Sequence, residues 1–175
     1  MTEQSSKHIL ITGKPGTGKT TLIKRLIPIL PRAGGFYTEE IRFKGKRVGF
    51  KIVTLSGEEG ILAHKDLHSP FRIGNYGVNI EDVEKVGVKA INTAISSCEV
   101  IVIDEIGKME LCSSHFQEAV RKALESGKKV LATIPVSPLP FLEQVKNRPD
   151  VVIFCISYNN REEVYQKIKK ELCSN

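Results

Sequence analysis

Residues 8–23 read HILITGKPGTGKTTLI, and this stretch decides the fold. The apolar start at 8–11 is typical of a buried parallel strand, and the run that opens at 20–26 is typical of a helix. Residues 13–20 between them satisfy the pattern GxxxxGK[ST], in which a glycine-rich turn cradles phosphate groups. Because the glycines fall at a strand-to-helix turn, the stretch predicts a loop that binds a nucleoside triphosphate.

Each position of this loop has a chemical reason. Glycines at 13, 16 and 18 permit positive φ angles and close backbone approach, so that N–H groups and the positive end of the following helix point at phosphate oxygens. We expect Lys19 to reach the β- and γ-phosphates, and the Thr20 hydroxyl to bind the Mg²⁺ that accompanies the nucleotide. The candidate nucleotide-binding residues of the loop are Gly13, Lys14, Pro15, Gly16, Thr17, Gly18, Lys19, Thr20 and Thr21.

Length and composition are those of a globular protein. The chain has 175 residues, of which 41% are hydrophobic and 26% charged, and this favours a single domain over residues 1–175. No apolar run approaches the roughly 20 residues that cross a bilayer, and the first residues lack the apolar core of a signal peptide, so we expect a cytosolic protein without a membrane partner. The net charge is +6, and residues 1–50 alone carry ten Lys or Arg against three Glu.

The cysteines and two neighbouring histidines are poorly placed for redox or metal chemistry. The cysteines are too widely spaced for a CxxC motif, and we expect reduced thiols at Cys98, Cys112, Cys155 and Cys173. His64 and His68 stand four residues apart, which fits two metal ligands on one helical face. No third ligand is nearby, so a solvated segment is the more common outcome.

Strand-like and helix-like segments alternate along the rest of the chain. Residues 33–42 and 48–55 alternate as strands do, around a predicted turn at 45–47 and before a second turn at 57–60, so we expect this region to be antiparallel. Further helices are expected at 82–97, 113–125, 139–145 and 161–172, and further strands at 99–103, 129–133 and 151–156. This order predicts an α/β fold of the P-loop NTPase type: a doubly wound, mainly parallel sheet extended at one edge by antiparallel strands.

A second chemical signal is the apolar run 100–103, which ends in Asp104 and Glu105. A buried strand with two acids at its carboxyl end is a Walker B pattern, although a pair of exposed acids that cap a strand is the alternative when these residues are taken alone. We expect Asp104 to hold Mg²⁺, and Glu105 to orient or deprotonate a water in line with the γ-phosphorus. The two motifs together assign Lys19, Asp104 and Glu105 to catalysis, Thr20 and Asp104 to the metal, and Mg²⁺ as the cofactor.

The sequence contains no clear motif for recognition of the base. Residues 104–107 also fit the DxxG switch of signalling GTPases, but no guanine-reading NKxD motif follows. The loop after 151–156 comes near the base in a parallel sheet, so Asn160 and Arg161 are candidates for contacts with the nucleotide ring, with an ordinary helix N-cap as the alternative. Thr133, at the carboxyl end of its strand, either senses the γ-phosphate or merely ends the strand.

A cation that neutralises the transferring phosphate is a further expectation. An arginine finger contributes about three to five decades in rate, yet spacing identifies none here. The candidates are Arg42, Arg72, Lys108 and Arg161, each with a surface ion pair as the alternative. The basic cluster at 42–47 is expected to be a solvated hairpin, and contact with nucleic acid is its alternative.

Four stretches resemble the thermophile-type nucleoside-triphosphatase family, which includes the human cancer-related nucleoside-triphosphatase. They are GKPGTGKTTL (13–22), AGGFYTEEIR (33–42), RIGNYGV (72–78) and VIDEIGKMEL (102–111), and the resemblance spans nearly the whole chain. It implies a monomeric hydrolase that acts slowly on several nucleoside triphosphates, with 13–20 on the phosphates, Asp104 serving Mg²⁺ and Glu105 serving the water. The family also tends to show Thr-x-x-Asn-Arg near its end, and residues 157–161 match it only with a shift.

The expected function is Mg²⁺-dependent hydrolysis of ATP, GTP, CTP and UTP to diphosphate and phosphate, with broad base specificity. One alternative is a P-loop kinase that phosphorylates a nucleoside, nucleotide or nucleic acid, in which a hydroxyl replaces the water. The other is a nucleotide-dependent module that binds nucleic acid through the basic first third of the chain.

Overall fold

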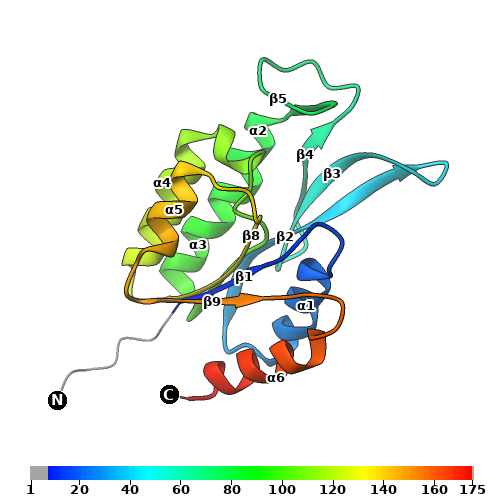
Figure 1. The fold of residues 1–175 in the computed structure, drawn as a ribbon. Coiled ribbons are helices and arrows are strands. Elements are labelled where there is room, and N and C mark those ends of the chain that lie inside the picture. Colours follow the sequence, from blue (N-terminus) through cyan, green and yellow to red (C-terminus); the bar gives the residue numbers. More distant parts are fainter. Residues whose placement is uncertain (1–7, 175) are drawn as a thin grey trace.

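The structure is a computed structural model that describes residues 8–174. Its strands are β1 (His8–Thr12), β2 (Ala33–Phe43), β3 (Lys46–Thr54), β4 (Glu59–His64), β5 (Arg72–Ile73), β6 (Tyr76–Val78), β7 (Val100–Ile103), β8 (Lys129–Ile134) and β9 (Val151–Cys155). They form one sheet in the order β5-β6-β4-β3-β2-β7-β8-β1-β9 (Figure 1).

The sheet has a parallel part and an antiparallel part. Strands β2, β7, β8, β1 and β9 are parallel to one another. Strands β3, β4, β6 and β5 continue the sheet antiparallel from β2. We call β3 to β6 the antiparallel wing. Thr12 lies opposite Ile134 and Cys155, and Ile103 lies opposite Ala132. The carboxyl ends of β1, β7, β8 and β9 therefore meet at one edge, where ligands of such sheets bind.

Helices cover both faces of the parallel part. They are α1 (Lys19–Leu26), η1 (Ile27–Ile29), α2 (Ile80–Asp82), η2 (Val83–Val88), α3 (Lys89–Ser97), η3 (Glu110–Cys112), α4 (Ser114–Glu125), α5 (Pro140–Lys146) and α6 (Arg161–Leu172). Helices α1 and α6 lie on one face, and α3, α4 and α5 lie on the other (Figure 1). Among residues 8–174, every helix is too short or too polar to span a bilayer.

Strand β7 shows why this arrangement is stable. Val100 and Val102 pack into the apolar cluster of α1 and α6, whereas Ile101 and Ile103 pack into the cluster of α3, α4 and α5. All four residues are at most 3% exposed. A parallel strand with helices on both faces is apolar at every position, so β7 carries the next residue, Asp104, into a dry environment.

The expected α/β fold of the P-loop NTPase type is confirmed, and so is the antiparallel extension at one edge of the parallel sheet. Two predicted turns were misplaced. The hairpin turn is at Lys44 and Gly45, whose φ angles are 49° and 76°, and such paired positive angles match the twist of the flanking strands. Residues 59 and 60 belong to β4 and not to a turn, and β2 pairs with β7 in parallel as well as with β3.

Candidate nucleotide-binding and catalytic site

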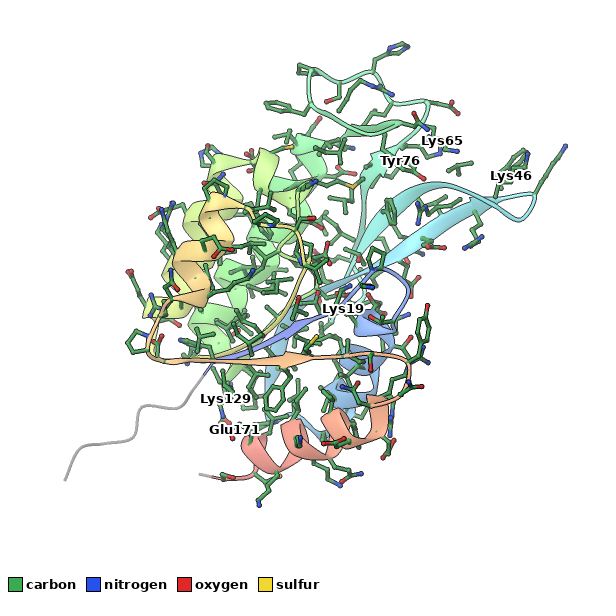
Figure 2. All side chains as sticks on the ribbon, viewed as in Figure 1. Lys19, Lys46, Lys65, Tyr76, Lys129 and Glu171 are labelled. Carbon is green, nitrogen blue, oxygen red and sulfur yellow. The ribbon has the colours of Figure 1, made fainter. Side chains whose placement is uncertain are left out.

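The loop between β1 and α1 has the shape that phosphate binding requires. Gly16 and Gly18 have φ angles of 80° and 96°, in the left-handed region that glycine favours. A Cβ on Gly13 would lie 2.6 Å from the carbonyl oxygen of Ile156, so glycine alone permits this close approach. The Lys19 ammonium donates to the Gly13 carbonyl at 2.8 Å, at the strand-to-helix turn seen in Figure 2. The N–H groups at the start of α1 thus face the loop as an anion site.

Asp104 is the polar centre of this edge of the sheet. It is only 1% exposed, and its Oδ2 accepts from the Thr20 hydroxyl at 2.8 Å, while its Oδ1 accepts from the Thr133 hydroxyl at 2.5 Å. The Thr38 N–H also approaches Oδ2, at 3.4 Å. Burial raises the pKa of Asp104, and the hydrogen bonds from Thr133 and Thr20 oppose that rise.

These residues fit a magnesium ion. The Asp104 carboxylate and the Thr20 hydroxyl are hard oxygen donors of the kind that Mg²⁺ prefers. The hydrogen-bond partners that the structure gives to this buried carboxylate are two hydroxyls and one backbone N–H, all of them uncharged. A buried carboxylate is stabilised by a paired cation or a metal. Thr20 and Asp104 are therefore suited to hold Mg²⁺ together with phosphate oxygens and water.

Two further carboxyl groups follow Asp104. Glu105 is half-buried and lines the same cleft as Lys19. Burial raises the pKa of Glu105, the charge of Lys19 lowers it, and the charge of Asp104 raises it. Glu110 is fully buried, and its Oε2 accepts from the Gly107 N–H at 3.1 Å. A Cβ on Gly107 would lie 2.4 Å from Glu105 Oε1 and 3.0 Å from Glu110 Oε2, so glycine at this position leaves room for both acids.

A cleft of about 910 Å³ runs from the phosphate loop to the antiparallel wing. Its lining comes from the loop and α1, from β2 and the wing, and from the loops after β7 and β8. The lining residues are Gly13, Pro15, Gly16, Gly18, Lys19, Thr20, Thr21, Lys24, Thr38, Glu39, Glu40, Arg47, Phe50, Leu62, Ile73, Asp104, Glu105, Lys108, Met109, Glu110, Pro135, Val136 and Ser137. The cleft thus brings together the loop, Asp104 and Glu105, as the sequence predicts.

Asn160 and Arg161 lie in the segment that follows β9, outside the lining of the cleft. The Asn160 side chain accepts from the Ser157 N–H at 2.7 Å and donates to the Cys155 carbonyl at 3.0 Å, so it closes the loop after β9 and does not cap α6. The Arg161 guanidinium stacks on the Tyr158 ring and lies 3.6 Å from a Cβ placed on Gly18. Arg161 therefore borders the loop, whereas the amide of Asn160 is engaged with backbone.

The candidate cations differ in where they lie. Lys108 is exposed and lines the cleft next to Glu105. Arg42 pairs with Glu40 and donates to the Gly45 carbonyl at the hairpin tip, and Arg72 donates to carbonyls of its own loop. Of the four candidates, the structure brings only Lys108 into the lining of the cleft. Lys46 lies far out on the hairpin (Figure 2), as expected for a solvated basic cluster.

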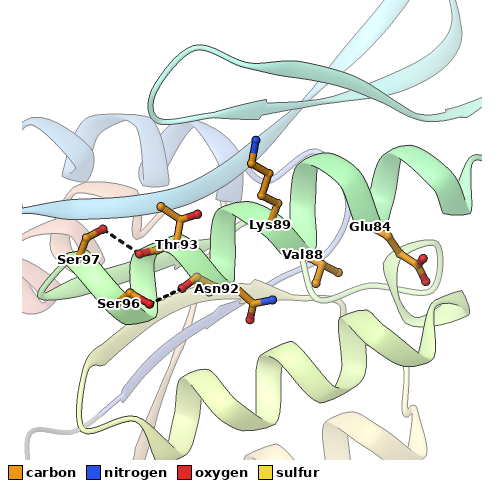
Figure 3. A pocket seen from close by; sticks show the side chains of 7 residues that line it. All are labelled: Glu84, Val88, Lys89, Asn92, Thr93, Ser96 and Ser97. Atoms are coloured by element: carbon orange, nitrogen blue, oxygen red, sulfur yellow. Dashed lines mark hydrogen bonds between the residues drawn. The ribbon is translucent and has the colours of Figure 1, made fainter.

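Other parts of the described chain carry less chemistry. A shallow hollow of about 600 Å³ lies along η2 and α3 and is lined by Glu84, Val88, Lys89, Asn92, Thr93, Ser96 and Ser97 (Figure 3). The Ser96 and Ser97 hydroxyls donate to carbonyls of their own helix. His64 lies in β4 and His68 in the following loop, and residues 8–174 contain no metal-binding group of three or more His, Cys, Asp or Glu. The four cysteines are free thiols.

Sequence reasoning missed several residues of the cleft. Thr38 belongs to no sequence motif, and its backbone N–H reaches Asp104 because β2 pairs with β7. The pairing of the wing likewise brings Arg47, Phe50 and Ile73 to the cleft. The run 102–111 contains Glu110, but its apolar surroundings depend on tertiary packing. Thr133, in contrast, was named from the sequence at the carboxyl end of its strand, and its contact with Asp104 follows because β8 lies between β1 and β7.

A glycine-rich phosphate loop between β1 and α1, facing a buried Asp104 that is hydrogen-bonded to Thr20, defines a P-loop nucleotide-binding protein. The comparisons with known proteins agree. The family model described as NTPase matches residues 8–169, and the chain belongs to this family.

Several relatives are similar over nearly the whole chain. Nucleoside-triphosphatase THEP1 of Thermotoga sp. (strain RQ2) is 57% identical over 160 residues, which cover 91% of this chain and 92% of that protein. The human cancer-related nucleoside-triphosphatase is 41% identical over 180 residues, covering 93% and 95%. The crystal structure of THEP1 from Aquifex aeolicus superposes with a TM-score of 0.85 at 37% identity, covering 92% of this chain and 96% of the other.

Proposed function

We propose that this protein hydrolyses nucleoside triphosphates to diphosphate and phosphate with Mg²⁺. The observation that carries the proposal is the place of Glu105. Glu105 directly follows the buried Asp104, which accepts a hydrogen bond from Thr20, and it lines the same cleft as the phosphate loop. The relatives from Thermotoga and human are both named nucleoside-triphosphatases, which supports the reaction class.

The residues of this chain have distinct tasks in the reaction. The loop 13–20 and Lys19 hold the phosphates, and Thr20 with Asp104 would hold Mg²⁺. When bound, the metal neutralises charge on the β- and γ-phosphate oxygens. Glu105 accepts a proton from a water as the oxygen of that water bonds to the γ-phosphorus, and the bond to the bridging oxygen breaks. The raised pKa of Glu105 suits this task, because a base is most efficient when its pKa lies near the working pH.

We further propose broad base specificity and slow turnover by a single domain. Arg161 and Tyr158 border the phosphate loop as a stacked pair, and a stacked surface accepts any base because every base has a π-face. Arg47, the one arginine in the lining, is paired with Glu40, so we expect turnover below roughly 1 s⁻¹, at the low end of enzymes. The cytosolic location and the monomeric state stay predictions from the sequence.

The test compares Glu105→Gln with the wild type. Phosphate release is measured with Mg²⁺ and each of ATP, GTP, CTP and UTP, and binding is measured with a fluorescent ATP analogue. We expect the variant to bind the analogue and to lose about 10²- to 10⁴-fold in turnover, as removal of a general base does. Glu118→Gln, an exposed residue of α4, is the matched control. Undiminished turnover in Glu105→Gln would remove Glu105 from the mechanism.

A further inference from the structure

On the side of the γ-phosphate, the cleft extends beyond the space that a nucleotide would fill. A triphosphate is a linear chain, and its γ end lies where Asp104, Thr20 and Glu105 meet. The nucleoside must therefore leave toward Gly16 and Gly18, where Tyr158 and Arg161 lie. The cleft extends in the other direction, past Glu105, to the antiparallel wing. Its volume of about 910 Å³ is near the upper end, roughly 1,000 Å³, of the usual range for ligand pockets.

The part of the cleft beyond Glu105 has walls suited to a flat ring. On the wing, the Phe50 ring meets the Tyr76 ring edge-on at 5.3 Å, and the Arg47 guanidinium lies over Phe50 at 5.0 Å. The Arg47 Nε also donates to the Tyr76 hydroxyl at 3.0 Å, which fixes this cluster. Figure 2 shows Tyr76 on the wing. Aromatic and guanidinium faces of this kind bind heteroaromatic rings by stacking.

The opposite wall comes from the loops that follow β7 and β8. Met109 and Val136 line it with apolar surface, and Ser137 adds a hydroxyl at its edge. Met109 adjoins the loop that carries Glu105, so a ligand between the two walls lies beside the group that accepts a proton. Thioether and aliphatic surfaces opposite an aromatic cluster suit the two faces of one ring.

The charges around this part favour an uncharged ligand. Glu39 is paired with Lys24 at 2.8 Å and with Lys51 at 3.6 Å. Glu40 is paired with Arg42 at 2.5 Å and with Arg47 at 3.3 Å. Because these ion pairs satisfy Glu39, Glu40 and Arg47, the charged residues that β2 and the wing contribute to the lining, a ligand that brings a net charge gains little there and loses its hydration.

From these observations we propose that this protein also transfers the γ-phosphoryl group to the hydroxyl of a nucleoside bound between Phe50 and Val136. The inference rests on the proposed function, because it uses the same donor and the same Glu105. The nucleoside hydroxyl oxygen forms a bond to the γ-phosphorus, the bond from phosphorus to the bridging oxygen breaks, the hydroxyl proton passes to Glu105, and the diphosphate leaves with the electron pair. Hydrolysis is then the reaction of the same site when water takes the place of the hydroxyl.

The test uses the full chain with Mg²⁺, ATP labelled on the γ-phosphate, and adenosine, guanosine, cytidine or uridine, one at a time. Labelled nucleoside phosphate and labelled free phosphate are separated and counted. We expect label on at least one nucleoside, at a rate above that of phosphate release without it. Phe50→Ala should lower the ratio of transfer to hydrolysis by about tenfold, as the loss of a stacked contact does. The loop variant Val136→Asp should also lower this ratio, because a charge then replaces apolar surface next to the ring. Phe43→Ala, at the exposed hairpin tip, should keep the ratio of the wild type.

The outcomes separate the two proposals. Free phosphate with no label on any of the four nucleosides overturns the transfer inference and leaves hydrolysis standing. Label on a nucleoside, together with no free phosphate in the reaction without nucleoside, overturns hydrolysis and supports transfer, and the absence of both products overturns both. Transfer with the same ratio in Phe50→Ala, Val136→Asp and the wild type overturns the assignment of the acceptor to this part of the cleft.

Discussion

The Glu110 carboxyl group accepts a hydrogen bond from the Gly107 N–H at 3.1 Å, beneath the loop that carries Glu105. Burial first, and then the charges of Glu105 and Asp104, hold the pKa of Glu110 well above its usual value. This shift favours the neutral carboxylic acid over the carboxylate. A neutral carboxylic acid and an amide have the same shape and both accept through a carbonyl oxygen.

This relationship predicts a contrast between two substitutions of Glu110. Glu110→Gln keeps the acceptor for Gly107 and should leave the free energy of unfolding nearly unchanged, whereas Glu110→Leu strands the buried N–H and should cost about 1–3 kcal/mol. Urea unfolding at pH 7, without metal or nucleotide, measures both. Equal losses in the two variants would mean that the folded protein needs the ionised carboxylate.

The contact between Thr20 and Asp104 predicts how the metal requirement depends on one hydroxyl. Thr20→Val removes the hydroxyl but keeps the shape, and we expect a higher Mg²⁺ concentration at half-maximal turnover and a loss of about 10²- to 10³-fold in kcat, as the loss of one group that stabilises transition-state charge causes. Thr20→Ser keeps the hydroxyl and serves as the control. Phosphate release across a Mg²⁺ titration is the measurement, and a Thr20→Val curve that overlays the wild type would exclude Thr20 as a metal ligand.

Lys108 is the candidate for neutralising charge on the γ-phosphate, because it lines the cleft beside Glu105. Lys108→Met should lower kcat by about ten- to a hundredfold with little change in KM, less than the loss of a true arginine finger. Arg72→Met is the comparison, since the Arg72 guanidinium is bonded within its own loop, and its kcat should match the wild type. If Arg72→Met lowers kcat and Lys108→Met does not, the assignment is reversed.

The sequence predicted the parts of the site that depend on local pattern. The loop 13–20 and the acids after 100–103 are contiguous motifs at strand ends, and their meeting follows from a parallel sheet. The roles of Thr38 and Arg47 could not be predicted in this way, because they depend on which strands pair and on their register. The same holds for Asn160, whose amide closes its loop through two backbone groups.

The wing was harder to predict than the parallel part. Strands β5 and β6 have two and three residues, which is too short for a clear alternation of apolar and polar side chains. The turn predicted at 45–47 lies at Lys44 and Gly45, and Lys44 has a positive φ angle, which residues other than glycine rarely adopt. Short elements and turns are thus fixed by tertiary pairing more than by local sequence.

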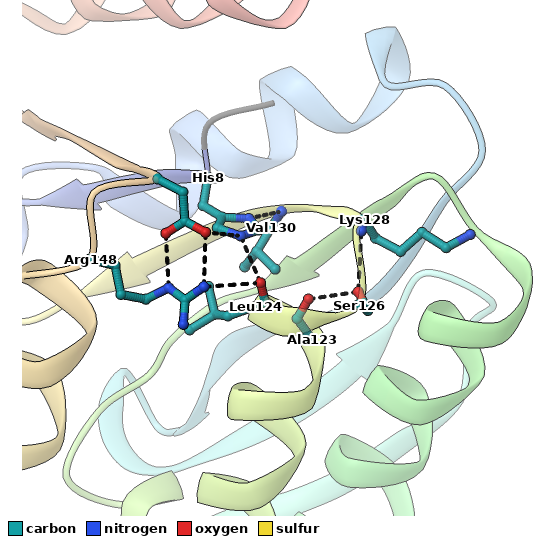
Figure 4. Close-up of polar contacts among 8 residues, drawn as sticks. His8, Ala123, Leu124, Ser126, Lys128, Val130 and Arg148 are labelled. Atoms are coloured by element: carbon teal, nitrogen blue, oxygen red, sulfur yellow. Dashed lines mark hydrogen bonds and ion pairs between the residues drawn. The ribbon is translucent and has the colours of Figure 1, made fainter. Parts of the chain in front are cut away.

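His8, at the amino end of β1 and remote from the cleft, uses both ring nitrogens in the fold (Figure 4). Its Nδ1 accepts from the Val130 N–H at 3.1 Å, so the proton of a neutral ring is on Nε2, which donates to the Leu124 carbonyl at 3.0 Å. Burial lowers the pKa of His8, and the hydrogen bond to Leu124 and the charge of Asp150 oppose this shift. Protonation would remove the acceptor that Val130 needs.

This network predicts a loss of stability in mild acid. Because the folded-state pKa lies below the ordinary 6.5, the unfolded chain binds more protons in the window just below pH 6.5. The contribution of His8 to the free energy of unfolding should therefore fall as pH drops through that window, by about 1.4 kcal/mol for each unit by which the pKa is lowered. Asp150, whose pKa is lowered chiefly by its hydrogen bond from Arg148, titrates below its ordinary value of 3.8 and so outside pH 5 to 8. The raised pKa values of Asp104, Glu105 and Glu110 make contributions of the opposite sign, so the difference between the wild type and a variant of His8 isolates the contribution of His8.

Urea unfolding at intervals between pH 5 and 8 tests this expectation. His8→Asn offers a donor and an acceptor that do not titrate, and relative to the wild type it should lose less free energy of unfolding as pH falls from 6.5 to 5. His68→Asn, an exposed loop residue, should keep the slope of the wild type. A difference between the wild type and His8→Asn that stays constant from pH 5 to pH 8 would contradict the role of the neutral His8 ring, because the hydrogen bond that Nδ1 accepts from Val130 requires the uncharged form.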